Sequence, residues 1–142
     1  MNSSGHTSPD GRLRLLLRTN ATTSGIGGVI AAAAPGPLDD LLGTGQPGWV
    51  RLVGIGLVLF AAVVIATARL DVGRMRNVVP AISAGDISWV VGSVAAIALG
   101  WFSTGGAVII GVVALMVGTF GAMQLVLLRR LGASVKRDPI SV

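Results

Sequence analysis

The stretch that most constrains the fold of this chain is the apolar run at residues 80–102, which contains the acidic residue Asp86. A transmembrane helix needs about 20 mostly apolar residues to cross ~30 Å of hydrocarbon. A helix that began after Asp86 and ended at Phe102 would reach only about 24 Å. We therefore expect the helix to begin earlier, at Pro80, whose missing N–H suits a first turn. The carboxyl group then lies inside the membrane, where a neighbouring helix must hydrogen-bond or neutralise it.

Composition places the chain among membrane proteins. Of its 142 residues 52% are hydrophobic and 12% are charged, about half the charged fraction of soluble domains. The chain has no cysteine, which excludes disulfides, thiolate catalysis and cysteine metal sites. The net charge of +5 comes from basic residues that flank apolar runs. This pattern indicates membrane orientation rather than nucleic-acid binding.

The apolar runs predict an all-α, polytopic membrane protein: a bundle of four transmembrane helices in one domain over residues 13–131. The spans are expected at residues 13–34, 50–68, 80–102 and 107–128. Residues 1–12 are polar and broken by proline and glycine, which predicts a disordered tail. Residues 132–142 are expected to form a basic tail.

The first span is the most polar of the four. It begins with Arg14 and Arg18 and passes through several Thr, Ser and Asn residues before its apolar half. A cleaved signal peptide is the alternative, since the run ends in an A-x-A pattern at residues 32–34. Because Pro35 would follow the cleavage site and the apolar part is short, we favour a membrane helix whose arginines reach the membrane surface.

The positions of Lys and Arg predict the orientation. They lie around the start of the first span, between the second and third spans, and after the fourth: Arg12, Arg14, Arg18, Arg69, Arg74, Arg76, Arg129, Arg130, Lys136 and Arg137. The other two loops lack them, apart from Arg51 at the start of the second span. The positive-inside rule then places both termini in the cytoplasm, in a multi-pass protein of the plasma membrane.

Three polar side chains are expected at a similar depth from the cytoplasmic side. Asp86 lies about 9 Å past Pro80, Asn20 about 10 Å past residue 13, and Gln124 about 7.5 Å before Arg129. Together with Arg18 as a counter-charge they would form a polar layer inside the bundle. Two further residues, Ser83 and Ser93, lie on the same helical stripe as Asp86.

This polar layer has two interpretations. An ionisable group inside the membrane is by default a candidate site for a proton or cation. Hydrogen bonds between helices, worth about 0.6 kcal/mol each, would instead fix the packing. We favour the structural interpretation.

Small residues recur along the fourth span at a spacing of three or four, at Gly111, Ala114, Gly118 and Ala122. Such a ridge lets helix backbones approach closely. It predicts a helix–helix contact along this face.

Several short motifs resemble a group of small actinobacterial integral membrane proteins. They are Ser24-Gly25 with Gly28, the segment at residues 37–43, Arg51 with Gly54, Trp89 with Ser93, and Gln124 followed by Leu128-Arg129-Arg130. The resemblance covers roughly residues 15–131 and implies four helices, with no activity attached. In that pattern Asn20 stands where Asp is common and Asp86 where Asn is common, an exchange that would suit a pair between the first and third spans. Gly92 replaces a further acid of the pattern.

The sequence is poor in catalytic groups, since it has no Glu, no Cys and no His within a span. We therefore expect no enzyme, cofactor or metal. The leading hypothesis is an accessory or assembly subunit, bound through its small-residue ridges to itself or to other membrane subunits. The alternative is a small proton- or cation-coupled transporter that uses Asp86.

Overall fold

The computed structural model describes residues 8–137, and this part of the chain contains five α-helices and no strand. The helices are α1 (Pro9–Ala33), α2 (Pro35–Leu42), α3 (Pro47–Thr67), α4 (Val72–Ala98) and α5 (Thr104–Arg137). The all-α prediction is confirmed. Three helices are long and apolar enough to cross a membrane, namely α3, α4 and the Thr104–Gly132 part of α5. The helix α1 is long enough, at 25 residues, but its polar first half keeps it out of this group.

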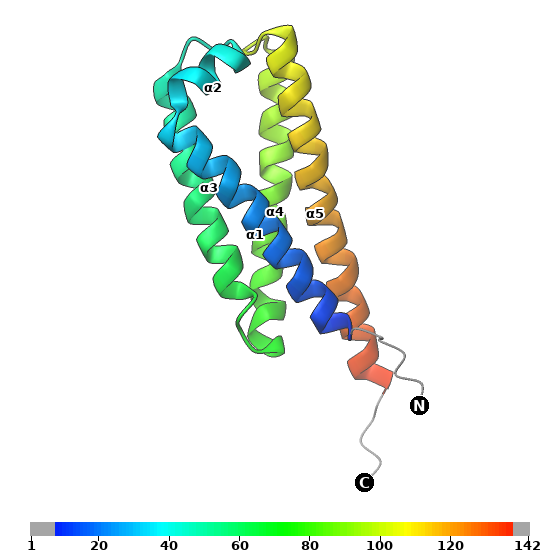
Figure 1. Ribbon diagram of the computed structural model, residues 1–142. Helices are drawn as coiled ribbons and strands as arrows, with labels where there is room; N and C mark the ends of the chain where they lie inside the picture. The colour runs from blue at the N-terminus through cyan, green and yellow to red at the C-terminus, as the bar shows by residue number, and fades with distance from the viewer. Residues whose placement is uncertain (1–7, 138–142) are drawn as a thin grey trace, which may run out of the picture.

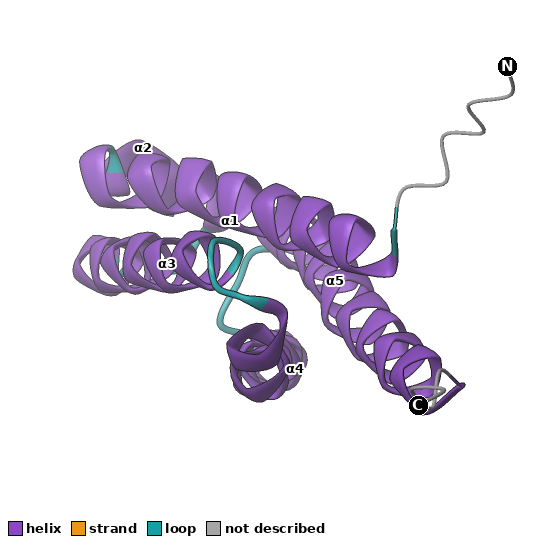
Figure 2. Ribbon diagram, turned by 90° about the horizontal axis from the view of Figure 1, so that it is seen from below, coloured by secondary structure: helices purple, strands orange, loops and turns teal. Residues whose placement is uncertain are grey.

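The four long helices lie side by side, and α2 closes one end of the bundle (Figure 1). The start of α1, the α3–α4 turn and the end of α5 share the opposite end. Seen along the bundle, α1 lies over α3 on one side and over α5 on the other (Figure 2). Packing is uneven, because α3 contacts α1 extensively and α4 contacts α5 extensively, whereas α3 barely contacts α4. The bundle is thus two helix pairs joined through α1.

Glycines bring the α1 and α3 backbones together. A Cβ atom added to Gly54 would lie 2.5 Å from the backbone nitrogen of Ala32. One added to Gly28 would lie 2.8 Å from the carbonyl oxygen of Gly54. Both distances are too short for any side chain, so this pair depends on the absence of side-chain atoms at the crossing.

Two apolar clusters fill the ends of the bundle. The larger lies towards the α3–α4 turn and contains Leu13, Leu17, Ala21, Val64, Ala68, Met75, Val79, Ile82 and Leu131. The smaller lies beneath α2 and contains Ala31, Leu42 and Val50. The backbone N–H of Ser103 donates to the carbonyl of Leu42 (2.9 Å) and ties the α4–α5 turn to α2. The polar residues described below lie between the two clusters.

The prediction that a helix begins at Pro80 is wrong. The helix α4 begins at Val72, and Pro80 lies in its interior. The reason is local, because the Asp71 side chain accepts a hydrogen bond from the Arg74 backbone N–H (2.9 Å) and caps the helix. At its other end α4 stops at Ala98, short of the predicted residue 102, and Gly100 follows with a φ of 71°.

Several other helix boundaries lie outside the predicted ones. The helix α1 already begins at Pro9, so residues 9–12 are helical and not a disordered tail, while residues 1–7 lie outside the described residues. The segment between the first two predicted spans contains α2, which begins at Pro35 and ends before Gly43, a residue with a φ of 71°. The helix α5 continues through residues 132–137 of the predicted basic tail, and residues 138–142 lie outside the described part.

Candidate functional site

Three buried polar side chains from three helices meet at one carboxylate oxygen. Asn20 on α1 donates from Nδ2 to Asp86 Oδ2 on α4 (3.0 Å). Gln124 on α5 donates from Nε2 to the same oxygen (3.1 Å). The exposed fractions of these residues are 0% for Asn20 and Gln124 and 2% for Asp86. The contact between Asp86 and Asn20 that the sequence predicts is therefore present.

Two hydroxyl groups orient the amides. Ser83 Oγ donates to Gln124 Oε1 (3.0 Å), and Ser24 Oγ donates to Asn20 Oδ1 (3.2 Å). Each amide oxygen thus accepts a hydrogen bond from a hydroxyl group, while each amide nitrogen donates one to the carboxylate. We call the group of Asn20, Ser24, Ser83, Asp86 and Gln124 the polar cluster. It links α1, α4 and α5 by side-chain hydrogen bonds alone.

Gly121, which is not among the predicted site residues, makes room for the polar cluster. A Cβ atom added to Gly121 would lie 3.2 Å from Asp86 Cβ, so a side chain there would press on the carboxylate. Gly121 lies three residues before Gln124, on the same face of α5. This spacing is visible in the sequence and could have identified Gly121 as a neighbour of the polar layer.

Two residues predicted for the polar layer lie elsewhere. Arg18 is exposed and does not join the polar cluster. Residues two apart on a helix do not share a face, so the rotation that buries Asn20 turns Arg18 outward. Ser93 is buried, with 7% exposed, but it lies about 10 Å further along α4 than Asp86.

The predicted ridge on α5 is only partly a helix contact. Ala114 is buried, and a Cβ atom on Gly118 would meet Val90 Cγ2 of α4 at 3.3 Å. Gly111 has nothing within 4 Å of its added Cβ, and Ala122 is exposed. The physical reason is that a spacing of four residues drifts by about 40° around an α-helix at each step. Ala122 therefore points away from the helix interface, whereas Gly121 lies on it.

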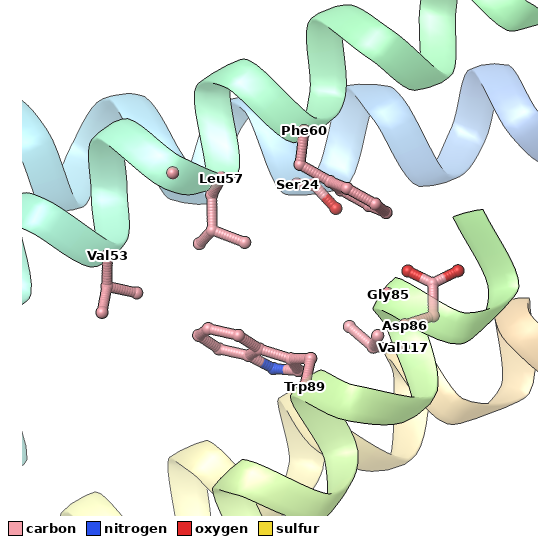
Figure 3. A pocket seen from close by; sticks show the side chains of 9 residues that line it. Ser24, Val53, Leu57, Phe60, Gly85, Asp86, Trp89 and Val117 are labelled. Carbon is pink, nitrogen blue, oxygen red and sulfur yellow. The ribbon is translucent and has the colours of Figure 1, made fainter. Parts of the chain in front are cut away.

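A cavity of about 280 Å³ opens between α3 and α4 beside the polar cluster (Figure 3). Its lining comes from all four long helices: Ser24, Val53, Gly56, Leu57, Phe60, Gly85, Asp86, Trp89 and Val117. In Figure 3 Phe60 and Trp89 project from facing helices, with the Asp86 carboxylate beside them. Both cluster amides donate to Oδ2 of this carboxylate, which leaves Oδ1 to hold a proton or face a cation.

The lining is otherwise almost entirely apolar, and Trp89 Nε1 is buried without a hydrogen-bond partner among the described residues. No group of three His, Cys, Asp or Glu side chains gathers within residues 8–137. The chemistry available at this cavity is therefore that of one carboxyl group beside two aromatic rings. Such a site can hold a proton or a single cation, or it can be covered by another apolar helix.

Comparison with known proteins returns no match among family models, curated proteins or solved structures. The resemblance to actinobacterial four-helix proteins therefore remains a prediction. The multi-pass membrane character rests on the three apolar helices, and any role for the polar cluster must be argued from its own geometry.

Proposed function

We propose that this protein crosses the plasma membrane four times, with both termini in the cytoplasm. The support for α1 as the fourth span is the character of its surface. It buries Asn20, while its exposed side carries large apolar residues, among them Ile26, Val29 and Ile30. The second half of α1, with its apolar groups outside, is suited to lipid, while the exposed Arg18 and Thr19 lie in the first half.

Cysteine labelling tests this topology. Gln46→Cys lies in the turn between α2 and α3, and Gly73→Cys lies in the first turn of α4. Both positions are exposed. A membrane-impermeant maleimide added to intact cells should label the first variant and should reach the second only after permeabilisation. Equal labelling of both variants in intact cells would rule out this orientation.

We further propose a non-enzymatic role as an assembly subunit that associates with a second copy of itself or with another membrane protein. One observation carries the proposal: the seam between the consecutive helices α3 and α4 is open. Within the seam, Val53 and Leu57 line one wall and Trp89 the other. An apolar helix inserted there would cover the cavity and complete the packing that α3 and α4 do not supply to each other.

Disulfide cross-linking in native membranes tests this role. We expect Val53→Cys, at the seam, to give a cross-linked dimer or a cross-link to a co-purifying subunit. Leu115→Cys is the matched control, because Leu115 is 74% exposed on α5 and does not line the seam. If Val53→Cys yields only monomer and mild-detergent purification recovers no second protein, the assembly role is wrong.

The second candidate function is proton- or cation-coupled transport. The observation that favours it is the position of Asp86, which both belongs to the polar cluster and lines the cavity. Asp86→Asn keeps an oxygen for both amide donors but removes the ionisable group. A transporter with this change should assemble normally and lose its flux in reconstituted vesicles. An assembly subunit should behave as wild type, and a wild-type protein that moves neither protons nor small cations would leave only the assembly role.

A further inference from the structure

A second cavity, of about 540 Å³, lies between α1 and α5 on the side of the bundle away from the α3–α4 seam. Its α1 wall consists of Arg12, Leu15, Leu16 and Thr19, and its α5 wall of Ala122, Met123, Val126, Leu127 and Arg130. We call it the α1–α5 groove. It shares no lining residue with the cavity at Asp86.

The groove has a cationic end and an apolar end. The start of α1 and the end of α5 lie at the same end of the bundle (Figure 1), so Arg12 and Arg130 are both at that end of the groove. From Arg12 to Thr19 the α1 wall extends about 10 Å, and from Arg130 to Ala122 the α5 wall extends about 12 Å. Apart from Thr19, every residue beyond the two arginines is apolar.

The apolar walls are open at the surface. The exposed fraction is 66% for Leu15 and 48% each for Met123 and Val126. A groove with two guanidinium groups at one end and an open apolar floor beyond them matches an amphiphile with an anionic head and a hydrocarbon tail. Guanidinium groups bind phosphate oxygens through paired hydrogen bonds, and basic pockets between membrane helices hold anionic head groups.

We propose that the α1–α5 groove binds an anionic phospholipid, with its phosphate at Arg12 and Arg130 and an acyl chain along the apolar floor. Two further arginines near the same end, Arg14 on α1 and Arg129 on α5, raise the local positive potential and favour an anionic over a zwitterionic head group. Free phosphate would leave the apolar floor uncovered. A transmembrane helix would cover the floor but carries no phosphate group.

The lipid would also fill a weak part of the bundle. Contacts of α1 with α5 are fewer than those of α1 with α3 or of α4 with α5. An acyl chain held between α1 and α5 would join the two helix pairs from the cationic end of the groove up to the level of the polar cluster, because Thr19 and Met123 adjoin Asn20 and Gln124. This inference does not depend on the assembly or transport role.

Native mass spectrometry of the full chain in detergent provides the test. The probes are phosphatidylglycerol, phosphatidylcholine with the same acyl chains, and inorganic phosphate. We expect bound phosphatidylglycerol at low micromolar lipid and little phosphatidylcholine. The double variant Arg12→Gln, Arg130→Gln should bind phosphatidylglycerol about tenfold or more weakly. The matched control Arg69→Gln, Arg74→Gln removes the same charge from the α3–α4 turn and should keep wild-type binding.

A second variant tests the apolar floor without touching the arginines. Ala122 is exposed and lines the groove, so Ala122→Trp should fill it and weaken phosphatidylglycerol binding, whereas Val112→Trp, on an exposed part of α5 outside the groove, should not. Equal binding of the two lipids, or equal losses in the two double arginine variants, would overturn the proposal. Displacement of phosphatidylglycerol by millimolar inorganic phosphate would overturn it as well, because the arginines alone would then explain the binding.

Discussion

The helix α1 joins the bundle through two contacts of opposite character. Against α3 it presents Gly28, and the two backbones approach closely because neither Gly28 nor Gly54 has a side chain. Against α4 it presents Asn20, whose side chain reaches the Asp86 carboxylate. The α1–α3 contact depends on the missing side chains of two glycines. The α1–α4 contact depends on the Asn20 amide and the Asp86 carboxylate in one relative orientation.

This difference shows how helices associate when the hydrophobic effect does not separate inside from outside. In lipid an apolar side chain gains little free energy by moving from the acyl chains into a helix contact. Close packing and interhelical hydrogen bonds therefore determine which helices associate. The contact of α1 with α3 relies on close packing. The contact of α1 with α4 relies on hydrogen bonds. We expect the first to be intolerant of any added volume and the second to tolerate a change of charge but not a loss of hydrogen-bonding groups.

The largest effect is expected at the glycine contact. Gly54→Ala places a methyl group 2.5 Å from a backbone atom, which cannot move without shifting α1. We expect a loss of about 3 kcal/mol in the free energy of unfolding, at the upper end for overpacking. Gly56→Ala is the control, because nothing lies within 4 Å of its added Cβ and alanine favours a helix. Unfolding in mild detergent measures both. Similar stabilities for the two variants would show that α1 and α3 do not touch as described.

An intermediate effect is expected in the polar cluster. Asp86→Ala leaves the buried amides of Asn20 and Gln124 without their acceptor, at a cost of about 2 kcal/mol. Asp86→Asn keeps an acceptor and should stay within about 0.6 kcal/mol of wild type. The same unfolding measurement separates the two variants. If both variants lose the same free energy of unfolding, the polar cluster depends on the charge of Asp86 and not on its hydrogen bonds. The contact of α1 with α4 would then not tolerate a change of charge.

The smallest effect is expected within the α4–α5 pair. A larger side chain at Gly118 meets Val90 Cγ2, the end of a side chain that can rotate away. Gly118→Leu should therefore cost about 1 kcal/mol, near the low end for overpacking. Gly111→Leu, on the same helix with nothing within 4 Å of its Cβ, should leave the melting temperature unchanged. A larger loss at Gly111 than at Gly118 would show that α5 is rotated relative to the present structure.

The sequence by itself determined where the four long helices run and roughly how deep their polar groups lie, but not that α2 is a helix. Apolar length and the rise per residue are local quantities. They were enough to place Asn20, Asp86 and Gln124 at similar depth, even though the helix starts moved from Leu13 to Pro9 and from Pro80 to Val72. Because the helices are longer than predicted at the same end of the bundle, Asn20, Asp86 and Gln124 still lie at similar depths.

Only the tertiary structure decided how each helix is rotated and which helix it contacts. Rotation decided that Arg18 is exposed and that Ala122 leaves the interface while Gly121 stays on it. Choice of neighbour decided that α3 packs on α1 through Gly54 and leaves an open seam towards α4. Span length and hydropathy are insensitive to rotation about a helix axis. The rotation is selected by backbone approach at glycines and by hydrogen bonds between helices, and both exist only once the helices are assembled.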